Sequence, residues 1–418
     1  MNAPQSITIE RAAHGMRLGE FVALMAALMA VNALGIDTML PALTMIAKEL
    51  GVTVENHEQL VVLVYIGCFG VGQLFWGPLA DRYGRRNMLV GAMVVYAGMS
   101  FIAAHAASFE LLLAARATQG LAAASSRVLA LSIIRDCYEG RRMAKVTSMT
   151  YMAFLAVPIF APSIGQLILL VAPWQWIFYF LGAFSLMVAL WASIRLPETL
   201  DPANQRAISL VVVGDAVRQI LTNRYSIGYT TAMAAVYGGL VGFINSSQQI
   251  FLHTFHAPEL FAICFAFMGG FMAVAALINA HFVERFGMRM ISHCALLAMV
   301  LLCLVRLGVV AGGHETLLLF TLLNGLTFFF YGLTGANFGA MAMAPMAHLA
   351  GTASSVQGFI QTSIATLAGL VIGQSFAGTT LPLTLGWELM ALAALAIVLI
   401  AERGRLFRPQ NPQPSPLR

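Results

Sequence analysis

Twelve long apolar stretches constrain this chain more than any other feature of its sequence. Each has about the 20 predominantly apolar residues that a helix needs to cross a bilayer. Hydrocarbon cannot satisfy free backbone groups, and the alternating pattern of barrel strands is absent, so each stretch is predicted to be a helix. The sequence therefore predicts an all-α membrane protein with twelve transmembrane helices, near residues 18–40, 58–80, 88–107, 109–132, 146–170, 174–195, 226–250, 259–282, 290–311, 315–340, 352–377 and 383–402.

Composition and the distribution of positive charge support this assignment. Hydrophobic residues make up 59% of the chain and charged residues 10%, against roughly 25% charged residues in a soluble domain. Outside the apolar stretches, lysine and arginine gather at the chain ends and in alternate loops, whereas the opposite loops contain Lys48 alone. The positive-inside rule then places both termini in the cytoplasm, with the basic loops against the lipid bilayer rather than nucleic acid. The run from Leu18 is too long for a signal peptide core, so we expect a multi-pass inner-membrane protein.

A short internal repeat divides the chain into two halves. The loop at 80–86 reads Ala-Asp-Arg-Tyr-Gly-Arg-Arg, and the loop at 283–289 reads Val-Glu-Arg-Phe-Gly-Met-Arg. Five of these seven positions hold an identical or similar residue at an offset of 203, which is about half the chain. Repeated halves are typical of alternating-access transporters whose site lies where the repeats meet.

The repeat and the polar stretches predict how the chain is organised. Within the longest polar stretch, the apolar spacing of residues 208–221 predicts a short amphipathic helix on the membrane surface. The predicted parts are an N-terminal six-helix bundle at 1–196, a cytoplasmic linker at 197–224, a C-terminal six-helix bundle at 225–408 and a disordered tail at 409–418.

The first copy of the repeated loop belongs to a longer motif. The run Gly-Pro-Leu-Ala-Asp-Arg-Tyr-Gly-Arg-Arg at 77–86 resembles the signature loop of the major facilitator superfamily. Its glycines let a helix end tightly, and its charges can cap or bridge helix ends. A simple topology signal is the other interpretation, and Met288 in place of Arg85 predicts a weaker second copy. The resemblance implies a conformational latch that stabilises the outward-facing state, formed by Gly77, Asp81, Arg82, Gly84, Arg85 and Arg86.

Asp37 is the acid placed deepest in an apolar stretch, since Glu20 and Glu388 are placed near helix ends. Ionisable groups inside a membrane are costly, which makes them functional candidates. Pro41 lacks a backbone donor, so the helix is expected to kink or end near this acid. The run 35–43 resembles the first helix of the bicyclomycin and chloramphenicol resistance branch of the drug:proton antiporters, which implies proton uptake and release at Asp37. A carboxylate held permanently by hydrogen bonds is the other interpretation.

Arg116 begins an Arg-x-x-Gln-Gly sequence that resembles the second motif of the superfamily. A buried arginine must pair or face a cavity, because it does not lose its proton. In the family this arginine lies close to the coupling acid, so the resemblance implies that Asp37 and Arg116 act together in proton coupling. Arg127 lies on nearly the same helix face, about 16 Å further on. Two interpretations of Arg127 are open: it lines the substrate cavity with Gln119 and binds an anionic ligand group, or it extends to the cytoplasmic surface.

A third motif lies in the fifth apolar stretch. Pro158, Pro162 and Gly165 belong to a run that resembles the antiporter motif, although Ala161 and Gln166 stand where glycines are usual. Small residues in this run let neighbouring helices approach closely and limit leakage. The run Ala-Gly-Thr-Ala-Ser-Ser at 350–355 is similar to the same resistance branch. The resemblance to the antiporter motif favours export over uptake.

The second half lacks a counterpart of Asp37 and Arg116, because Leu240 and Leu319 stand at the offset of 203. We therefore expect the intramembrane charge and the proton to belong to the first half, and much of the substrate surface to belong to the second. Neutral polar and aromatic groups suit an amphipathic ligand, although ordinary interhelical hydrogen bonds explain them equally well. The predicted cavity residues of the second half are Tyr237, Asn245, Gln249, Asn324, Phe328 and Tyr331.

Together these features predict a secondary transporter. We expect a monomer that exports drugs or amphipathic small molecules in exchange for protons, without a metal or cofactor. The alternative is an exporter of one endogenous metabolite such as a siderophore, purine or peptide, followed by an importer. An ATP-driven pump would need a Gly-Lys-Ser/Thr loop, which the sequence lacks. A clustered catalytic set is also missing from the sequence, so a receptor or scaffold of transporter fold is the remaining class.

Overall fold

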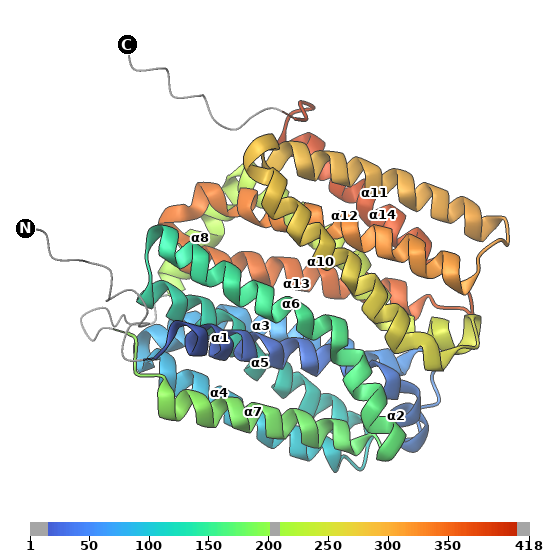
Figure 1. The fold of residues 1–418 in the computed structure, drawn as a ribbon, viewed down its shortest axis with the longest axis horizontal. Helices are drawn as coiled ribbons and strands as arrows, with labels where there is room; N and C mark the ends of the chain where they lie inside the picture. Colours follow the sequence, from blue (N-terminus) through green and yellow to red (C-terminus); the bar gives the residue numbers. More distant parts are fainter. Residues whose placement is uncertain (1–15, 201–209, 408–418) are drawn as a thin grey trace, which may run out of the picture. The chain divides into compact units, whose positions relative to one another are not determined.

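The computed structural model describes residues 16–200 and 210–407, and the long elements in these ranges are all α-helices. Twelve helical spans within them are long and apolar enough to cross a membrane (Figure 1). The predicted fold class is therefore confirmed. The chain forms two compact units. The first contains the described residues up to Thr53 and those from Leu60 to Leu210, and the second contains Val54–Gln59 and the described residues from Val211 onward.

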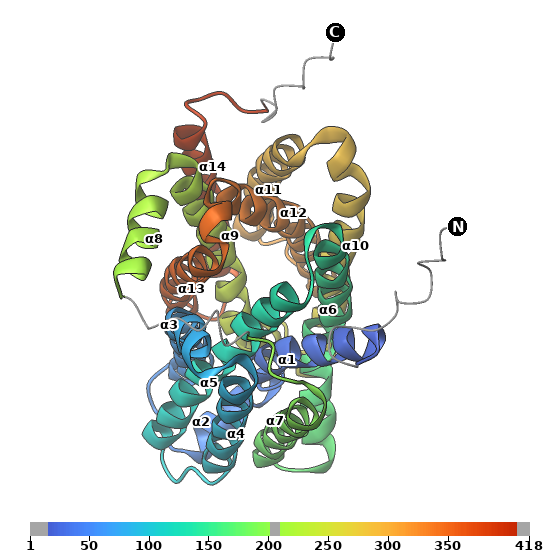
Figure 2. The ribbon, with the colours of Figure 1, turned by 90° about the vertical axis from the view of Figure 1, so that its left-hand side faces the viewer.

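The helices of the first unit pack in definite pairs. The main contacts are α3 with α5, α4 with α7, α4 with α5, and α1 with α6. In Figure 2 these helices are seen nearly end-on, and α4 and α7 lie side by side. The helices are α1 (Leu18–Asp37), α2 (Leu43–Glu49), α3 (Leu60–Tyr83), α4 (Arg85–Ala104), α5 (Phe109–Cys137), α6 (Gly140–Val171) and α7 (Gln175–Arg195).

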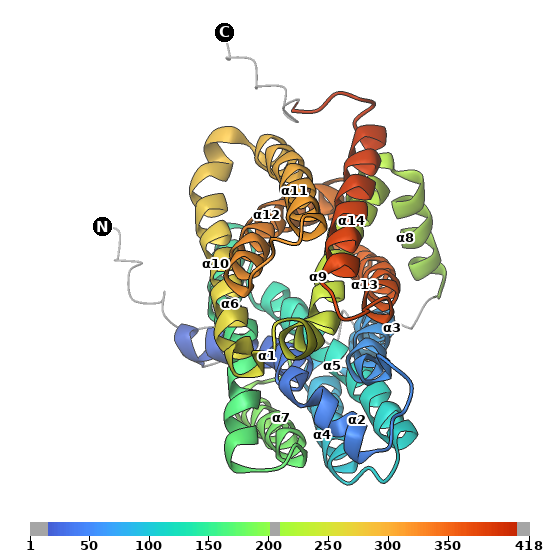
Figure 3. The same ribbon diagram turned by 90° about the vertical axis from the view of Figure 1, so that its right-hand side faces the viewer.

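The second unit repeats the same pairing. It contains the pairs α10 with α12, α11 with α14, α11 with α12, and α9 with α13, and α9 also packs extensively against α14 and α12. Counted by membrane spans, the first four pairs are the main pairs of the first unit, which supports the internal repeat; α11, α12 and α14 are seen together in Figure 3. The helices are α8 (Leu210–Thr222), α9 (Arg224–Gln249), α10 (Phe261–Phe286), α11 (Met288–Ala311), α12 (Leu317–Met343), α13 (Ala350–Gln374) and α14 (Leu381–Ala401).

The first membrane span is broken next to its buried acid. The helix α1 ends at Asp37, where the backbone N–H of Thr38 still donates to Leu34. A 3-10 helix (η2, Leu40–Ala42) follows, and Pro41 lies within it, before α2 begins. Proline cannot supply the N–H that would continue the α-helical ladder, so the break lies where the sequence predicts it.

The structure divides the chain differently from the predicted domains. The helix predicted over 208–221 is observed as α8, but the boundary between the units falls at its first residue rather than at 196. Residues 54–59 are assigned to the second unit, although they precede α3 in the sequence. The sequence does not predict that residues 54–59 belong to the second unit, because the assignment depends on contacts with residues that are distant in the sequence. The predicted disordered tail, 409–418, lies outside the described residues.

Candidate transport site

Arg116 occupies the centre of the first unit. Its side chain is completely buried on α5, yet each part of its guanidinium has an oxygen partner. Nε donates to the Val61 carbonyl at 3.0 Å, and Nη2 donates to the Gly35 carbonyl at 2.7 Å. Nη1 donates to Oε1 of Gln119 at 3.1 Å. A buried cation is therefore held by neutral oxygens from three helices, which lowers the cost of removing it from water.

Aromatic side chains complete the surroundings of Arg116. Its guanidinium lies over the Tyr65 ring, 4.2 Å from the centroid, in a geometry that attracts a cation to the π-face. The hydroxyls of Tyr65 and Tyr96 lie close to Gly35, where an added Cβ would be 2.7 and 2.6 Å from them. Glycine at position 35 thus leaves room for both tyrosines beside the carbonyl that binds Arg116. Neither tyrosine was predicted, because aromatic residues are common throughout membrane helices.

Gln119 is tied into the same network, while Arg127 is outside it. The amide nitrogen of Gln119 donates to Ser100 Oγ at 2.7 Å, so this buried side chain links Arg116 to α4. Arg127, three turns further along α5, is exposed in the unit. The first unit therefore places a fully held arginine and an accessible arginine on one helix. Gln119 is buried and hydrogen-bonded to Arg116 and Ser100, so it does not lie on an exposed surface.

Asp37 is buried at the last residue of α1, with 5% of its surface exposed. Its Oδ1 atom has no hydrogen-bond partner, which rules out a carboxylate tied by hydrogen bonds at both oxygens. Among the described residues, the ion pairs do not include Asp37. Asp37 and Arg116, which the resemblance implies act together, thus form no ion pair in the described structure. Arg116 instead binds the carbonyl of Gly35, two residues before the acid.

Helix α6 supports the break that follows Asp37. An added Cβ at Gly165 would overlap the carbonyl oxygen of Thr38 and come within 3.2 Å of Pro41. Only glycine permits this approach of α6 to the broken span. Pro158 and Pro162 both lie inside α6. The run that resembles the antiporter motif therefore packs against the residues that directly follow Asp37 in the first span.

Two of the predicted latch residues, Asp81 and Arg85, form ion pairs that join α3, α4 and α5. Gly84 joins α3 to α4 with a φ of +94°, a conformation that residues with a Cβ rarely adopt. Arg85, which is 4% exposed, pairs with Asp81 at 2.5 Å and with Asp136 at 3.0 Å. Arg82 lies over the Tyr83 ring, 5.2 Å from its centroid. The loop thus connects neighbouring helices through ion pairs and a defined turn, which a simple topology signal would not require.

Glu198, which sequence analysis did not single out, completes this cluster. Its two carboxylate oxygens accept hydrogen bonds from the backbone N–H groups of Arg85 at 2.8 Å and Arg86 at 3.2 Å. The guanidinium of Arg86 in turn donates to the Ser193 carbonyl on α7. An anion at a helix N-terminus satisfies free N–H groups and the helix dipole. Glu198 therefore caps α4 and ties it to the chain after α7.

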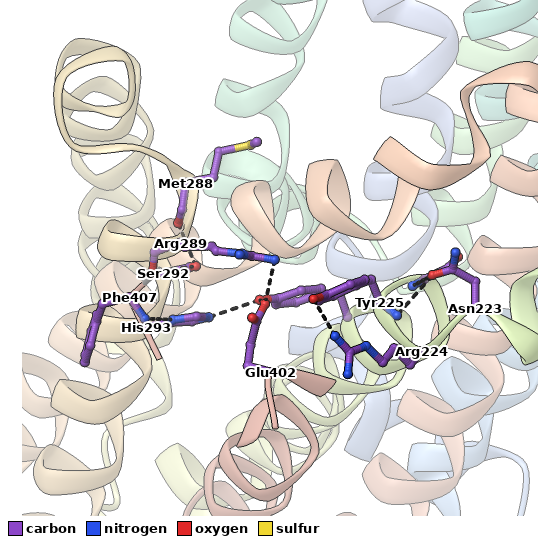
Figure 4. A network of polar contacts seen from close by, with 11 residues as sticks. Asn223, Arg224, Tyr225, Met288, Arg289, Ser292, His293, Glu402 and Phe407 are labelled. Carbon is purple, nitrogen blue, oxygen red and sulfur yellow. Dashed lines mark hydrogen bonds and ion pairs between the residues drawn. The ribbon is translucent and has the colours of Figure 1, made fainter. Parts of the chain in front are cut away.

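The second copy of the loop builds a different cluster (Figure 4). Gly287 has a φ of +81°, as its counterpart Gly84 does at +94°. Arg289 pairs with the buried Glu402 at 3.0 Å. Glu402 Oε1 also accepts a hydrogen bond from the Tyr229 hydroxyl at 2.6 Å, and His293 Nε2 lies 3.1 Å from the same hydroxyl oxygen. In the second copy the ion pair is therefore made by Arg289, the counterpart of Arg86, with Glu402 at the end of α14.

The predicted cavity residues of the second unit are mostly engaged in its interior. Gln249 accepts from Gln59 at 2.6 Å and donates to Asn56 at 2.8 Å and Glu58 at 2.5 Å. Asn245 is buried without a partner for either amide atom. Gln249 is therefore held in a polar cluster of the unit rather than left free for a ligand.

On α12, two of the predicted cavity residues are core residues. Asn324 accepts from Arg306 at 2.9 Å, and Phe328 packs edge-on against Phe243. Tyr331 and, on α9, Tyr237 are half-buried. The expectation that Asn324 and Phe328 line a cavity is thus not supported by their contacts. Their regular spacing along α12 reflects packing, which produces the same period.

The expectation that intramembrane charge belongs to the first half alone is wrong. Arg306 on α11 is 1% exposed, and Glu388 on α14 is 5% exposed. The sequence predicts Glu388 near a helix end, in an apolar stretch near 383–402. The helix in fact begins at Leu381, so Glu388 lies two turns inside it. Both units therefore contain a buried arginine and a buried acid.

Comparisons with known proteins identify the family. Residues 25–370 match the Major Facilitator Superfamily. A bicyclomycin resistance protein homolog of Haemophilus influenzae is 25% identical over 381 residues, covering 88% of this chain and 93% of the relative. Multidrug resistance protein MdtL of Klebsiella pneumoniae is 27% identical over 368 residues, covering 87% and 92%. The crystal structure of a D-xylose-proton symporter shares the fold at 13% identity, with a TM-score of 0.69, covering 90% of this chain and 97% of that one.

These matches agree with twelve helical spans of membrane-crossing length and with the repeated packing of the two units. The protein is a multi-pass inner-membrane protein, and its family transports small molecules. The 77–86 loop and the first span resemble this family, and the family match over residues 25–370 confirms the resemblance. The chain belongs to the major facilitator superfamily of transporters, with relatives named for bicyclomycin resistance and multidrug resistance.

Proposed function

We propose that this protein exports drugs or other amphipathic small molecules in exchange for protons. The observation that carries the proposal is Asp37, a buried carboxyl group at the break of the first span, with an oxygen that has no partner. An ionised carboxylate in such a place is costly, whereas the neutral, protonated acid is not. Asp37 therefore provides a place where one proton can be carried.

Arg116 couples the charge of Asp37 to the shape of α1. While the acid is neutral, the arginine binds the Gly35 carbonyl at 2.7 Å. Loss of the proton creates a carboxylate two residues away, which competes with that carbonyl for the same guanidinium. The carboxylate carries a full negative charge, so it attracts the guanidinium more strongly than a neutral carbonyl does. Deprotonation thus favours a rearrangement at the end of α1, against which Gly165 of α6 packs.

The names of the relatives support the proposed direction and substrate class. Two proteins that match most of this chain are named for resistance to bicyclomycin and to multiple drugs. Resistance by transport requires removal of the compound from the cell. In an antiporter, protons that enter the cell down their gradient drive the substrate in the opposite direction, out of the cell.

A resistance panel tests this function. The chain would be expressed in a drug-sensitised strain, and growth measured against chemically diverse antibiotics, dyes and amphipathic cations. We expect resistance to several unrelated compounds, and no resistance from the Asp37→Asn variant at equal membrane abundance. Resistance to a single compound would favour a dedicated exporter. A full-length, membrane-inserted wild-type protein that protects against none of them would contradict multidrug efflux.

A further inference from the structure

Arg127 is an exposed charge well inside a membrane span. It lies on α5, ten residues before the helix ends at Cys137, which is about 15 Å along the axis. Its side chain is exposed, whereas Arg116 on the same helix is completely buried. A cation inside a membrane span is costly unless it has a partner or contacts water. Arg127 lies outside the network that holds Arg116, so its charge needs another partner.

The face of α5 that carries Arg127 packs within the first unit. The neighbours on that face are Ala123, one turn before, and Ala130, one turn after, and both are completely buried. The large apolar side chains that α5 exposes, Leu111 and Leu121, lie about 160° and 120° away around the helix. The exposed surface of Arg127 is therefore not on the lipid-facing side of α5, and the two short alanine side chains leave it uncovered.

The nearer end of α5 is beyond the reach of Arg127. The next charged residue along the helix is Arg135, in the last turn, about 12 Å further on. A fully extended arginine side chain spans roughly 7 Å from Cα to its terminal nitrogens, given bond lengths of about 1.5 Å. Side chains of an α-helix also lean toward its N-terminus, which is away from Arg135. Of the two interpretations of Arg127 that the sequence leaves open, extension to the membrane surface is therefore the weaker.

The negative charges of the first unit are held elsewhere. The acids with a cationic or backbone partner are Glu20, Asp81, Asp136 and Glu198. Asp37 follows the Gly35 carbonyl that Arg116 binds, and Arg116 is about 16 Å from Arg127 along α5. Among the described residues, neither the ion pairs nor the cation–π contacts include Arg127. The described part of this unit therefore does not supply the negative charge that would balance Arg127.

We propose that Arg127 binds an anionic group of the transported compound, namely a carboxylate, sulfonate or phosphate. The guanidinium is planar and presents its N–H donors as a fork, which matches such a group with two hydrogen bonds at once. The ligand thus brings the counter-charge with it. The substrate class that follows is the amphipathic anion, with an apolar body and one acidic group. Its transport rests on the proposed function, whereas its binding can be measured without transport.

Equilibrium binding of a matched pair of dyes to the purified full-length protein tests this assignment. Anilinonaphthalene sulfonate carries one negative charge, and N-phenylnaphthylamine has the same skeleton without it. With binding to protein-free micelles subtracted, the ratio of the two affinities isolates the contribution of the charge. We expect Arg127→Gln to lower the affinity for the sulfonate, relative to the neutral dye, about tenfold or more.

Two further variants separate the site from general charge effects. Arg127→Lys keeps the positive charge and should retain most of the preference for the sulfonate, although it loses the planar fork. Arg135→Gln removes an exposed arginine from the same helix and should bind both dyes as wild type does. Should Arg127→Gln not fold, Arg127→Met is the second variant without the charge, and the same loss is expected.

Three results would overturn the proposal. They are an unchanged affinity ratio in Arg127→Gln, an equal loss in Arg127→Gln and Arg135→Gln, and displacement of the sulfonate by phosphatidylglycerol, which would assign the arginine to a lipid headgroup. A wild-type protein that confers no resistance, yet binds the sulfonate through Arg127, would contradict only the proposed function. Resistance to neutral and cationic compounds, without Arg127-dependent binding of the sulfonate, would contradict only the assignment of Arg127.

Discussion

Arg116 shows how a charged residue is kept inside a membrane protein without a buried counter-ion. Its three guanidinium nitrogens donate hydrogen bonds to the carbonyls of Val61 and Gly35 and to the amide oxygen of Gln119. The sequence predicts that this arginine needs partners, because an ionised group in a membrane span must be compensated. It does not predict which ones, since backbone carbonyls carry no sequence signal. The expected acid, Asp37, was chosen by resemblance and is not the partner observed.

A substitution at Arg116 tests this network. Lysine keeps the charge but not the planar fork, so Arg116→Lys should leave at least one buried carbonyl unsatisfied. Each such acceptor costs about 1–3 kcal/mol. We expect a clear drop in the melting temperature of the purified protein in detergent. Arg127→Lys, on the exposed part of the same helix, is the matched control and should leave the melting temperature unchanged. Equal stability of the two variants would contradict the network.

Glu315 makes the stability of the second unit depend on pH. Because burial raises the pKa of this carboxyl group, the folded state holds the proton more tightly than the unfolded state. The free energy of unfolding therefore falls as the pH rises from the ordinary glutamate value, about 4.3, through the raised value of the folded state. Glu315→Gln removes this loss and still accepts the hydrogen bond from Thr380.

Thermal unfolding measured across this pH range checks the sign of the effect. Glu315→Gln should gain stability relative to wild type as the pH rises, and should match it below the ordinary glutamate value. Glu55→Gln, at an exposed acid, is the control and should follow wild type throughout. A Glu315→Gln variant that loses stability with rising pH would show that the carboxylate is favoured by folding.

At the scale of helices, close approach is governed by a few glycines. Gly120 lies where an added Cβ would overlap the Tyr65 carbonyl oxygen on α3, in the most extensively packed helix pair of the first unit. A backbone atom cannot move aside as a flexible side chain can. The glycine of the Arg-x-x-Gln-Gly motif is therefore a packing residue, which sets the distance between α5 and α3 and so the reach of Arg116 to Val61.

The corresponding prediction compares two glycines in helices. Gly120→Ala should lower the melting temperature, by an amount equivalent to roughly 1–3 kcal/mol for an overpacked site. Gly98→Ala on α4, where nothing lies within 4 Å of the added Cβ, should be neutral or slightly stabilising. Both variants add the same methyl group to a helical glycine, so they differ in the space available to that group. A neutral Gly120→Ala would mean that α3 and α5 are further apart than described.

Helix positions were well predicted from sequence, and contacts made across the fold were not. Apolar runs and Pro41 mark the spans and the break after Asp37, because each has a local physical cause. The capping of α4 by Glu198 depends on the chain returning from α7, and no local pattern reports it. The same holds for residues 54–59, whose hydrogen bonds to Gln249 place them in the second unit.

For the whole molecule, the duplication is more complete than the sequence indicates. In the sequence the repeat is visible only in the loops at 80–86 and 283–289, but in the structure four equivalent helix pairs recur in both units. Each unit also buries at least one arginine and one acid within its helices: Arg116 and Asp37 in the first, and Arg306 and Glu388 in the second. These residues are not at equivalent positions, so an offset search misses the correspondence. The two units are alike in packing, and they differ in where their charges lie.

The central claim, that Asp37 carries the coupled proton, predicts a specific transport defect. Purified protein in proteoliposomes would be given a compound from the resistance panel and an imposed pH gradient. Wild type should transport against the substrate gradient, whereas Asp37→Asn should lose this pH-driven flux and keep exchange of labelled for unlabelled substrate. The matched control is Glu20→Gln, which removes an acid on the same helix that is paired with Arg195 at 2.7 Å. It should retain pH-driven transport, and full pH-driven transport by Asp37→Asn would contradict the claim.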